Sequence, residues 1–217
     1  MEFTKHFLYL GYFKSYNLKD DYDISKRISK AFQNMGMLKY VWEDPHIDLY
    51  SKYLFFVAMP LNLLLWGCES WALKKTSYND LNVFLHQSIR RIIGISMMQV
   101  TDKRMSIEKL RKLFYNIPDA CTLIAVKQLN FIGKVVRRED SFFPKQLLTA
   151  WVNHKRKRGG VLTTDRKSVV TALGLLYPDT VWRKDENGAL CKDAKGKKIP
   201  ETIYRAVSDH SNIGLRM

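Results

Sequence analysis

Cysteine is scarce in this 217-residue sequence. The three cysteines, Cys68, Cys121 and Cys191, lie far apart and have neither the spacing of a disulfide framework nor that of a metal site. The chain does not open with a charged and then apolar segment, which argues against secretion. We therefore expect an intracellular protein in a reducing compartment.

Long apolar stretches are missing too. The run from Tyr53 to Gly67 is shorter than the roughly 20 residues that cross a bilayer, and Pro60 and Asn62 interrupt it. A buried helix with a kink at the proline fits this pattern better than a membrane span. We expect no membrane partner.

Signatures of catalysis are missing as well. The sequence has no nucleophile elbow and no glycine-rich phosphate loop, and its five histidines share no catalytic or ligand spacing. Glu43, Asp44, His46 and Asp48 form a compact group of acids and a histidine, but helix capping and surface positions explain all four. We predict no catalytic residue, no metal and no cofactor for this chain.

Negative charge is in short supply. Asp and Glu number 21 against 36 Lys and Arg, which gives a net charge of +15. Such a balance favours a polyanionic partner, and basic and aromatic residues alternate here as they do on surfaces that follow a nucleic-acid strand. Charge kept for solubility is the alternative explanation. We expect nucleic acid as the partner.

Apolar residues recur at three- and four-residue intervals over most of the chain, which is the period of helices with one buried face. A first helix is predicted after Asp23, a suitable N-cap. Its apolar stripe consists of Ile24, Ile28, Ala31, Met35 and Leu38. Asp44 and Pro45 are predicted to begin a long helix that runs to about Trp66, with Gly67 at its end.

The second half of the chain continues this pattern. Ser77 is predicted to open a helix that carries Arg90 and Arg91 in its last turn and ends at Gly94. The stripe of that helix consists of Leu81, Phe84, Leu85, Ser88, Ile89 and Ile92. Further helices are predicted over 106–114, 116–136, 144–153 and 164–176. After Pro178, turn signals replace the helical period, so we expect a hairpin or an irregular tail.

Five segments, in this order, resemble the region downstream of the catalytic core in non-LTR (LINE-like) retrotransposon reverse transcriptases. They are FLYLG at 7–11, ISKRISKAF at 24–32, LLLWGCESWAL at 63–73, FLHQSIRRIIGI at 84–95 and KQLNFIGKVVRRED at 127–140. The combination of the third and fourth segments at this separation is far more specific than any one short motif. The resemblance extends from about Phe7 to Leu175.

The resemblance implies a mainly α fold: a thumb-like helical bundle with a short N-terminal β-hairpin left from the palm, and a small irregular or hairpin tail. Residues 1–22 correspond to the end of the palm with its primer grip, and residues 23–153 to the helical thumb. Residues 154–217 correspond to a basic C-terminal segment with one helix and an irregular tail. A missing palm and fingers domain is then an implied partner.

The adjacent acids Asp20 and Asp21 raise the question of a polymerase metal site. In the family the catalytic aspartates lie upstream of the Tyr-Leu-Gly segment, whereas here the pair lies downstream of it. No earlier strand is evident that would supply the third carboxylate that two divalent ions need. We interpret the pair as a solvated turn with charge at a helix N-terminus, and expect no polymerase activity of this chain alone.

Thumb helices follow the sugar-phosphate backbone, so the resemblance assigns nucleic-acid contacts to the basic residues of the helices and to the primer-grip turn. The predicted contacts are Tyr9, Leu10, Gly11, Lys26, Arg27, Lys30, Arg90, Arg91, Arg137, Arg138, Lys155, Arg156, Lys157 and Arg158. Lys26, Arg27 and Lys30 are predicted to lie away from the apolar stripe of their helix.

Each of these groups has a second explanation. Residues 9–11 fit a core strand, and Arg90 and Arg91 fit the favourable end of a helix dipole. The first-helix group and Arg137 and Arg138 fit plain solvated faces. The run 155–158 fits an unstructured loop or a nuclear-import signal.

Two functions therefore remain in view. The first is a non-catalytic fragment of an RNA-directed DNA polymerase that grips RNA–DNA template-primer or element RNA without reading sequence. The second is a decayed retroelement fragment, or a structural or interaction module, without a nucleic-acid role. Since a thumb normally packs on a palm, we also expect uncovered apolar surface around Phe3, Phe7 and Tyr9.

Overall fold

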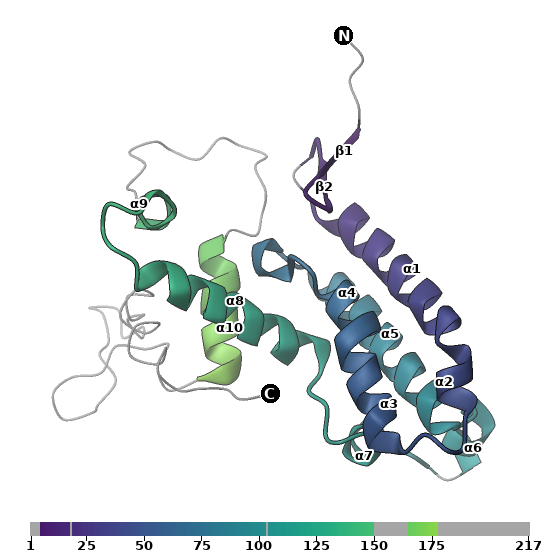
Figure 1. Cartoon of the computed structure of the whole chain (residues 1–217). Helices are drawn as coiled ribbons and strands as arrows, with labels where there is room; N and C mark the ends of the chain where they lie inside the picture. Colours follow the sequence, from purple (N-terminus) through teal and green to yellow (C-terminus); the bar gives the residue numbers. More distant parts are fainter. Residues whose placement is uncertain (1–4, 18, 103, 150–164, 178–217) are drawn as a thin grey trace, which may run out of the picture. The chain divides into compact units, whose positions relative to one another are not determined.

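Helices dominate the computed structural model, which describes residues 5–17, 19–102, 104–149 and 165–177 (Figure 1). The packing divides the chain into two units. The first consists of Met1–Gly67 and Leu73–Leu123, and the second of Cys68–Ala72 and Ile124–Met217. The predicted mainly α fold with an N-terminal hairpin is confirmed, while the predicted tail lies outside the described residues from 178 onward.

The chain opens with the predicted hairpin. Strands β1, His6–Tyr9, and β2, Tyr12–Ser15, pair antiparallel with Tyr9 opposite Tyr12. The two residues between them have positive φ angles, 47° at Leu10 and 79° at Gly11. A two-residue turn with φ > 0 at both positions matches the right-handed twist of its strands, and glycine adopts such a φ without steric cost.

Helix α1, Asp21–Met37, begins one turn earlier than predicted. Its N-cap position is Asp20, and Asp23 lies buried within the first turn. The prediction that Asp23 caps the helix is therefore wrong, because its carboxylate is used by a neighbouring side chain and by the hairpin backbone. The predicted stripe holds at Ile24, Ala31 and Met35, which are all buried.

A short helix, α2, Lys39–Glu43, follows α1, and its Trp42 indole donates a 3.0 Å hydrogen bond to the carbonyl of Met35. The predicted long helix then starts at Leu49 instead of after Pro45. Its cap is Asp48, which accepts from the Ser51 amide at 3.1 Å and satisfies one of the free donors of the first turn.

This second long segment is interrupted at the predicted place. It consists of α3, Leu49–Phe56, a π-helical stretch, η1, Val57–Leu61, and α4, Asn62–Leu64. Pro60 lies in η1. Because proline has no amide hydrogen and its ring clashes with the preceding turn, the regular α pattern gives way around it.

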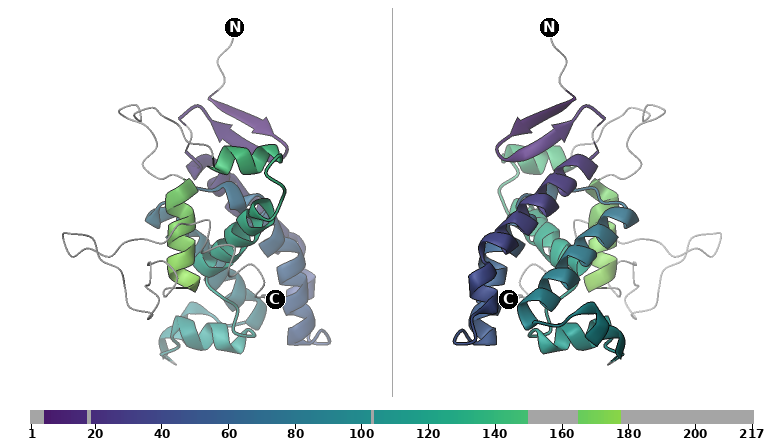
Figure 2. Two further views of the ribbon diagram at one scale, coloured as in Figure 1. Left: turned by 90° about the vertical axis from the view of Figure 1, so that its left-hand side faces the viewer. Right: turned by 90° about the vertical axis from the view of Figure 1, so that its right-hand side faces the viewer.

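Helix α5, Lys75–Ile93, is the longest of the described helices. The whole predicted stripe is buried, but Ser77 lies inside the helix and is buried too, so the prediction that it opens the helix is wrong. The helix ends at Gly94 in a left-handed conformation, as predicted. Helix α1 packs against α4 and η1 and also against α5, so these helices lie side by side (Figures 1 and 2).

Two short helices complete the first unit. The sequence did not predict α6, Met97–Asp102, in which no residue is buried. Helix α7, Ile107–Leu113, was predicted, and its Ser106 cap accepts from the Lys109 amide at 3.2 Å. Helix α7 packs against α5.

The second unit contains a 3-10 turn, η2, Cys68–Ser70, most of α8, Ala120–Val136, and helices α9, Phe143–Thr149, and α10, Asp165–Leu176. Helix α8 begins after the predicted start at Asn116 and Pro118. Gln128 of α8 donates to the carbonyl of Trp71 at 2.9 Å, and Trp71 is buried. The apolar core around α10 consists of Val169, Leu173, Leu129, Ile132 and Tyr177.

No helix among the described residues is both long and apolar enough to cross a membrane.

Candidate nucleic-acid groove

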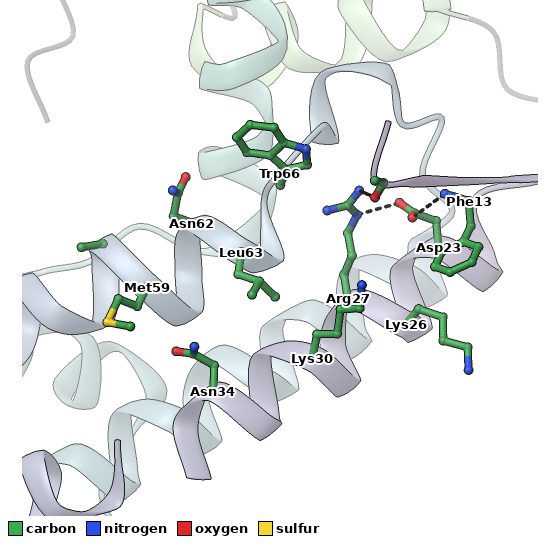
Figure 3. A pocket seen from close by; sticks show the side chains of 12 residues that line it. Phe13, Asp23, Lys26, Arg27, Lys30, Asn34, Met59, Asn62, Leu63 and Trp66 are labelled. Atoms are coloured by element: carbon green, nitrogen blue, oxygen red, sulfur yellow. Dashed lines mark hydrogen bonds and ion pairs between the residues drawn. The ribbon is translucent and has the colours of Figure 1, made fainter. Parts of the chain in front are cut away.

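A groove of about 450 Å³ runs along the first unit between α1 and the α3–η1–α4 segment. The turn of the hairpin closes one end of it (Figure 3). Polar, basic and exposed apolar side chains from both walls line the groove. They include Lys26, Lys30 and Asn34 from α1, and Met59, Asn62 and Trp66 from the opposite wall.

The α1 wall follows from the helical period. Lys26, Lys30 and Asn34 are spaced by four residues, so they lie along one face of the helix. Both lysines are exposed. The buried residues of the α1 stripe point elsewhere, which leaves this face for solvent and for the groove.

Arg27 is not on the surface, contrary to the prediction that it lies with the lysines away from the buried face. It is 6% exposed. Its Nε lies 2.8 Å from Asp23 Oδ2, and its Nη2 donates to the carbonyl of Gly11 at 2.8 Å. The Asp23 carboxylate neutralises the charge of Arg27, and the hairpin turn supplies a second acceptor through the Gly11 carbonyl.

The buried pair of Asp23 and Arg27 ties three segments together. Asp23 Oδ1 accepts from the Phe13 amide of β2 at 3.0 Å, and Arg27 holds the carbonyl of the hairpin turn. Gly67, just after α4, lies against the arginine: a Cβ atom there would come within 3.8 Å of Arg27 Nη2. Gly67 has a φ of 73°, which a side chain would strain.

Trp66 lies at the hairpin end of the groove (Figure 3). A Cβ atom on Gly11 would meet its Nε1 at 3.9 Å, and the residue is 59% exposed. Trp71, five residues further on, is 1% exposed and belongs to a core. An indole left largely in solvent, in a groove that two lysines also line, is a surface suited to stacking.

Asn34 supplies a polar group without a partner. Its Oδ1 is buried and accepts no hydrogen bond from the residues that the structure describes. Figure 3 shows the amide pointing into the space between α1 and the opposite wall. Because a buried acceptor without a donor costs about 1–3 kcal/mol, a ligand with a hydrogen-bond donor would be favoured here.

The acidic pair of the opening segment does not form a metal site. The Tyr12 hydroxyl donates to Asp20, while the Asp21 carboxylate lies 2.6 Å from Lys74 Nζ. Asp44 Oδ1 accepts a 2.8 Å hydrogen bond from the His46 amide, which is the pattern of an Asx turn. Across the described part of the chain, no group of three or more His, Cys, Asp or Glu side chains would hold a metal ion.

Arg90 and Arg91, the other predicted basic contacts of the first unit, are not among the residues that line the groove. Arg90 and Arg91 lie in the last turn of α5, and that end of α5 faces α6, away from the hairpin (Figure 1). Arg91 is exposed and Arg90 half-buried. Arg137 and Arg138 are exposed residues of the second unit, with Arg138 5.8 Å from the ring centroid of Phe142. The run 155–158 lies outside the described residues.

Arg90 belongs to a smaller pocket of about 150 Å³ that His86 also lines. Burial lowers the pKa of His86 below its ordinary value of 6.5, and the charges of Arg111 and Arg90 lower it further, whereas Asp119 raises it. The Nε2 atom of this histidine is buried and has no hydrogen-bond partner among the described residues. Neutral histidine is therefore the favoured form.

The primer-grip candidates are exposed. Tyr9 is 58% and Leu10 81% exposed, so the alternative of a core strand is wrong for them. Phe7 is 59% exposed, which confirms the expected apolar surface for this residue and for Tyr9. Phe3 lies outside the described residues.

Sequence reasoning found part of the α1 wall of the groove and the hairpin turn, and missed the opposite wall. Lys26, Lys30 and Gly11 were predicted contacts and do line it, but Trp66 and Asn34 were not singled out. Asn34 had a usable signal, since it continues the four-residue spacing of the lysines. Trp66 had none, because it ends an apolar run that reads as core.

The groups that line the groove are suited to binding a polar or charged ligand. Both oxygens of the Asp23 carboxylate already accept hydrogen bonds, and the remaining polar groups are ammonium and amide groups. No model of a known protein family matches this chain, and no curated protein and no solved structure matches it either.

Proposed function

We propose that this chain is the primer-grip, thumb and basic downstream region of a non-LTR retrotransposon reverse transcriptase. In this role it holds RNA–DNA template-primer or element RNA through sequence-independent contacts to the backbone. A palm and fingers domain would supply the polymerase chemistry. The proposal includes an intracellular location, in the nucleus if the run 155–158 acts as an import signal.

The observation that carries this proposal is the groove wall made by Lys26 and Lys30. Both side chains are exposed, and their four-residue separation places them about 6 Å apart along the helix axis. One strand of a duplex carries a phosphate about every 3.4 Å along its axis, so this rise between the two helix positions is close to two phosphate steps. The exposed hairpin turn with Tyr9 and Leu10 lies at the same end of α1.

The alternative is a structural or interaction module, in which the basic surface is left over. The exposed apolar side chains of the hairpin support it, since a group such as Phe7, Leu8, Tyr9 and Leu10 suits a protein partner. The two functions differ in what salt does to binding.

The test is fluorescence anisotropy of the full chain with a labelled blunt RNA–DNA hybrid over a salt series. The double variant K26A/K30A should lower the slope of log K against log salt by about 2, because each lost phosphate contact removes about 0.9 counterion. The control is K109A/K112A on α7, which removes the same charge at the opposite end of the first unit.

If the two double variants lower the salt slope equally, binding depends on the overall charge of the chain and not on the groove. Binding by the unaltered chain only at very low salt would support the interaction module instead. Either result would overturn the proposal.

A further inference from the structure

The groove holds groups that backbone binding does not use. A contact to phosphates needs only the lysines, yet the groove also presents the exposed indole of Trp66, the thioether of Met59 and the unpartnered Oδ1 of Asn34. Met59 is 41% exposed. These groups offer a flat apolar face, an apolar side contact and a hydrogen-bond acceptor within one cavity.

That combination fits the chemistry of a nucleobase. Every base has a π-face that stacks on an aromatic side chain, and such stacking is tolerant of sequence. Adenine, cytosine and guanine carry an exocyclic amino group that donates to an amide carbonyl. The phosphate of the same nucleotide is attracted by a lysine at the rim.

The size of the groove selects an unpaired base. A volume of about 450 Å³ is that of a pocket for a small ligand, which excludes a double helix from its interior. A paired base inside the helix has both faces covered by its neighbours in the stack, so it has none to offer the indole. An unpaired base has already lost part of its stacking and enters at little cost.

The charge of the groove favours a nucleotide over a peptide side chain. Asp23 and Arg27 neutralise each other at 2.8 Å, which leaves Lys26 and Lys30 as the formal charges of the lining. The Asn34 Oδ1 acceptor and the two lysine cations together fit a ligand that has a hydrogen-bond donor at one end and a negative charge at the other. A nucleotide is such a ligand.

We propose that the groove takes one unpaired nucleotide, with its base stacked on Trp66, its donor edge toward Asn34 and its phosphate near Lys26 and Lys30. This inference rests on the proposed function, since the nucleotide belongs to a nucleic acid held by the same wall. It adds a preference that backbone binding lacks: a hybrid with an unpaired base is bound more tightly than one without.

The experiment compares three RNA–DNA hybrids of the same sequence with the full chain. The first is fully paired, the second has a single bulged adenosine, and the third has an abasic residue at the bulge. The last two have the same charge and the same interruption of the helix, so their affinity ratio reports the base alone. We expect at least a fivefold ratio for the unaltered chain.

Substitutions in the groove test whether the affinity ratio between the bulged and the abasic hybrid arises there. Trp66→Leu should bring it to about 1 while the affinity for the paired hybrid and the salt slope stay within twofold, and Trp66→Phe should keep most of it. The matched control is Tyr40→Leu, since Tyr40 on α2 is 84% exposed. Asn34→Leu should lower the ratio about twofold or more without lowering the melting temperature, because its Oδ1 accepts no bond from the described residues.

The failures are distinguishable. A ratio near 1 for the unaltered chain, with salt-dependent binding of the paired hybrid, would overturn this inference and leave the proposed function standing. A ratio that survives Trp66→Leu would place the base elsewhere and also overturn it. Failure to bind any of the three hybrids at moderate salt would overturn both.

Discussion

The buried pair of Asp23 and Arg27 allows a sharp test of how the first unit is held together. The Asp23 side chain is 1% exposed and that of Arg27 is 7% exposed. Removing the carboxylate by Asp23→Ala leaves a guanidinium inside the fold with the Gly11 carbonyl as its remaining acceptor among the hydrogen bonds described above. It also takes away the acceptor of the Phe13 amide.

The expected cost is large. Removing one partner of a buried ion pair destabilises a protein by about 3–5 kcal/mol, because the other charge stays buried without compensation. Most domains unfold with a free energy of about 5–15 kcal/mol, so Asp23→Ala should remove a large part of the stability of the first unit. The double variant D23A/R27M buries no charge and should be more stable than the single variant by about 2 kcal/mol.

The control uses the neighbouring ion pair on the same helix turn. Asp21 lies 2.6 Å from Lys74, but their side chains are 50% and 49% exposed. Asp21→Ala should therefore cost at most about 1 kcal/mol, since solvent screens an exposed pair. The measurement is urea unfolding followed by circular dichroism at 222 nm, with the m value compared between variants. Equal costs for Asp21→Ala and Asp23→Ala would refute the reasoning.

Two further predictions concern pH and self-association. Burial and the charges of Arg111 and Arg90 lower the pKa of His86 below 6.5. As the pH falls, the unfolded chain therefore takes up a proton at this residue before the folded chain does. The contribution of His86 to the free energy of unfolding is fully present above pH 6.5 and is lost as the pH drops toward the folded pKa. His86→Gln should flatten that part of the decline in urea midpoints between pH 7.5 and 5; equal declines would contradict the assignment. The exposed apolar hairpin should cause concentration-dependent self-association in sedimentation velocity, and Leu10→Asn should reduce it while keeping the turn, because asparagine is favoured where φ is positive. A monomer at all concentrations before the substitution would count against the exposed face.

The buried stripes of the long helices could be predicted because they depend on a repeating period, which single exceptions do not destroy. The stripe of α5 was predicted residue by residue. The first residues of the helices were harder to predict, since Asp and Ser occur both as helix caps and at other positions. Asp23 was taken for a cap but forms an ion pair, and Ser77 was taken for a cap but is buried inside α5.

Contacts between segments distant in sequence were beyond such reasoning. Arg27 lies three residues after Ile24 and four before Ala31, at the edge of the buried stripe of α1. Its buried charge is matched by Asp23 and by the carbonyl of Gly11, which comes 16 residues earlier and could not be paired with it from the sequence. Helix α6 gave no signal because none of its residues is buried, so it has no apolar stripe. The π-helical form of the stretch around Pro60 was likewise not predictable, although the interruption itself was.

The position of Arg27 connects the stability of the first unit with the proposed nucleotide site. Its bond to the Gly11 carbonyl fixes the hairpin turn, and Gly11 in turn approaches the indole nitrogen of Trp66. Loss of the pair in D23A/R27M would remove the bonds from α1 to the Gly11 carbonyl and to the Phe13 amide, while the lysines and the tryptophan remain. Binding of a paired hybrid, which needs only the lysines, should then keep its salt slope, whereas the base-dependent ratio should fall. If the ratio survives in a folded double variant, Trp66 binds the base without help from the hairpin, and the ion pair serves stability alone.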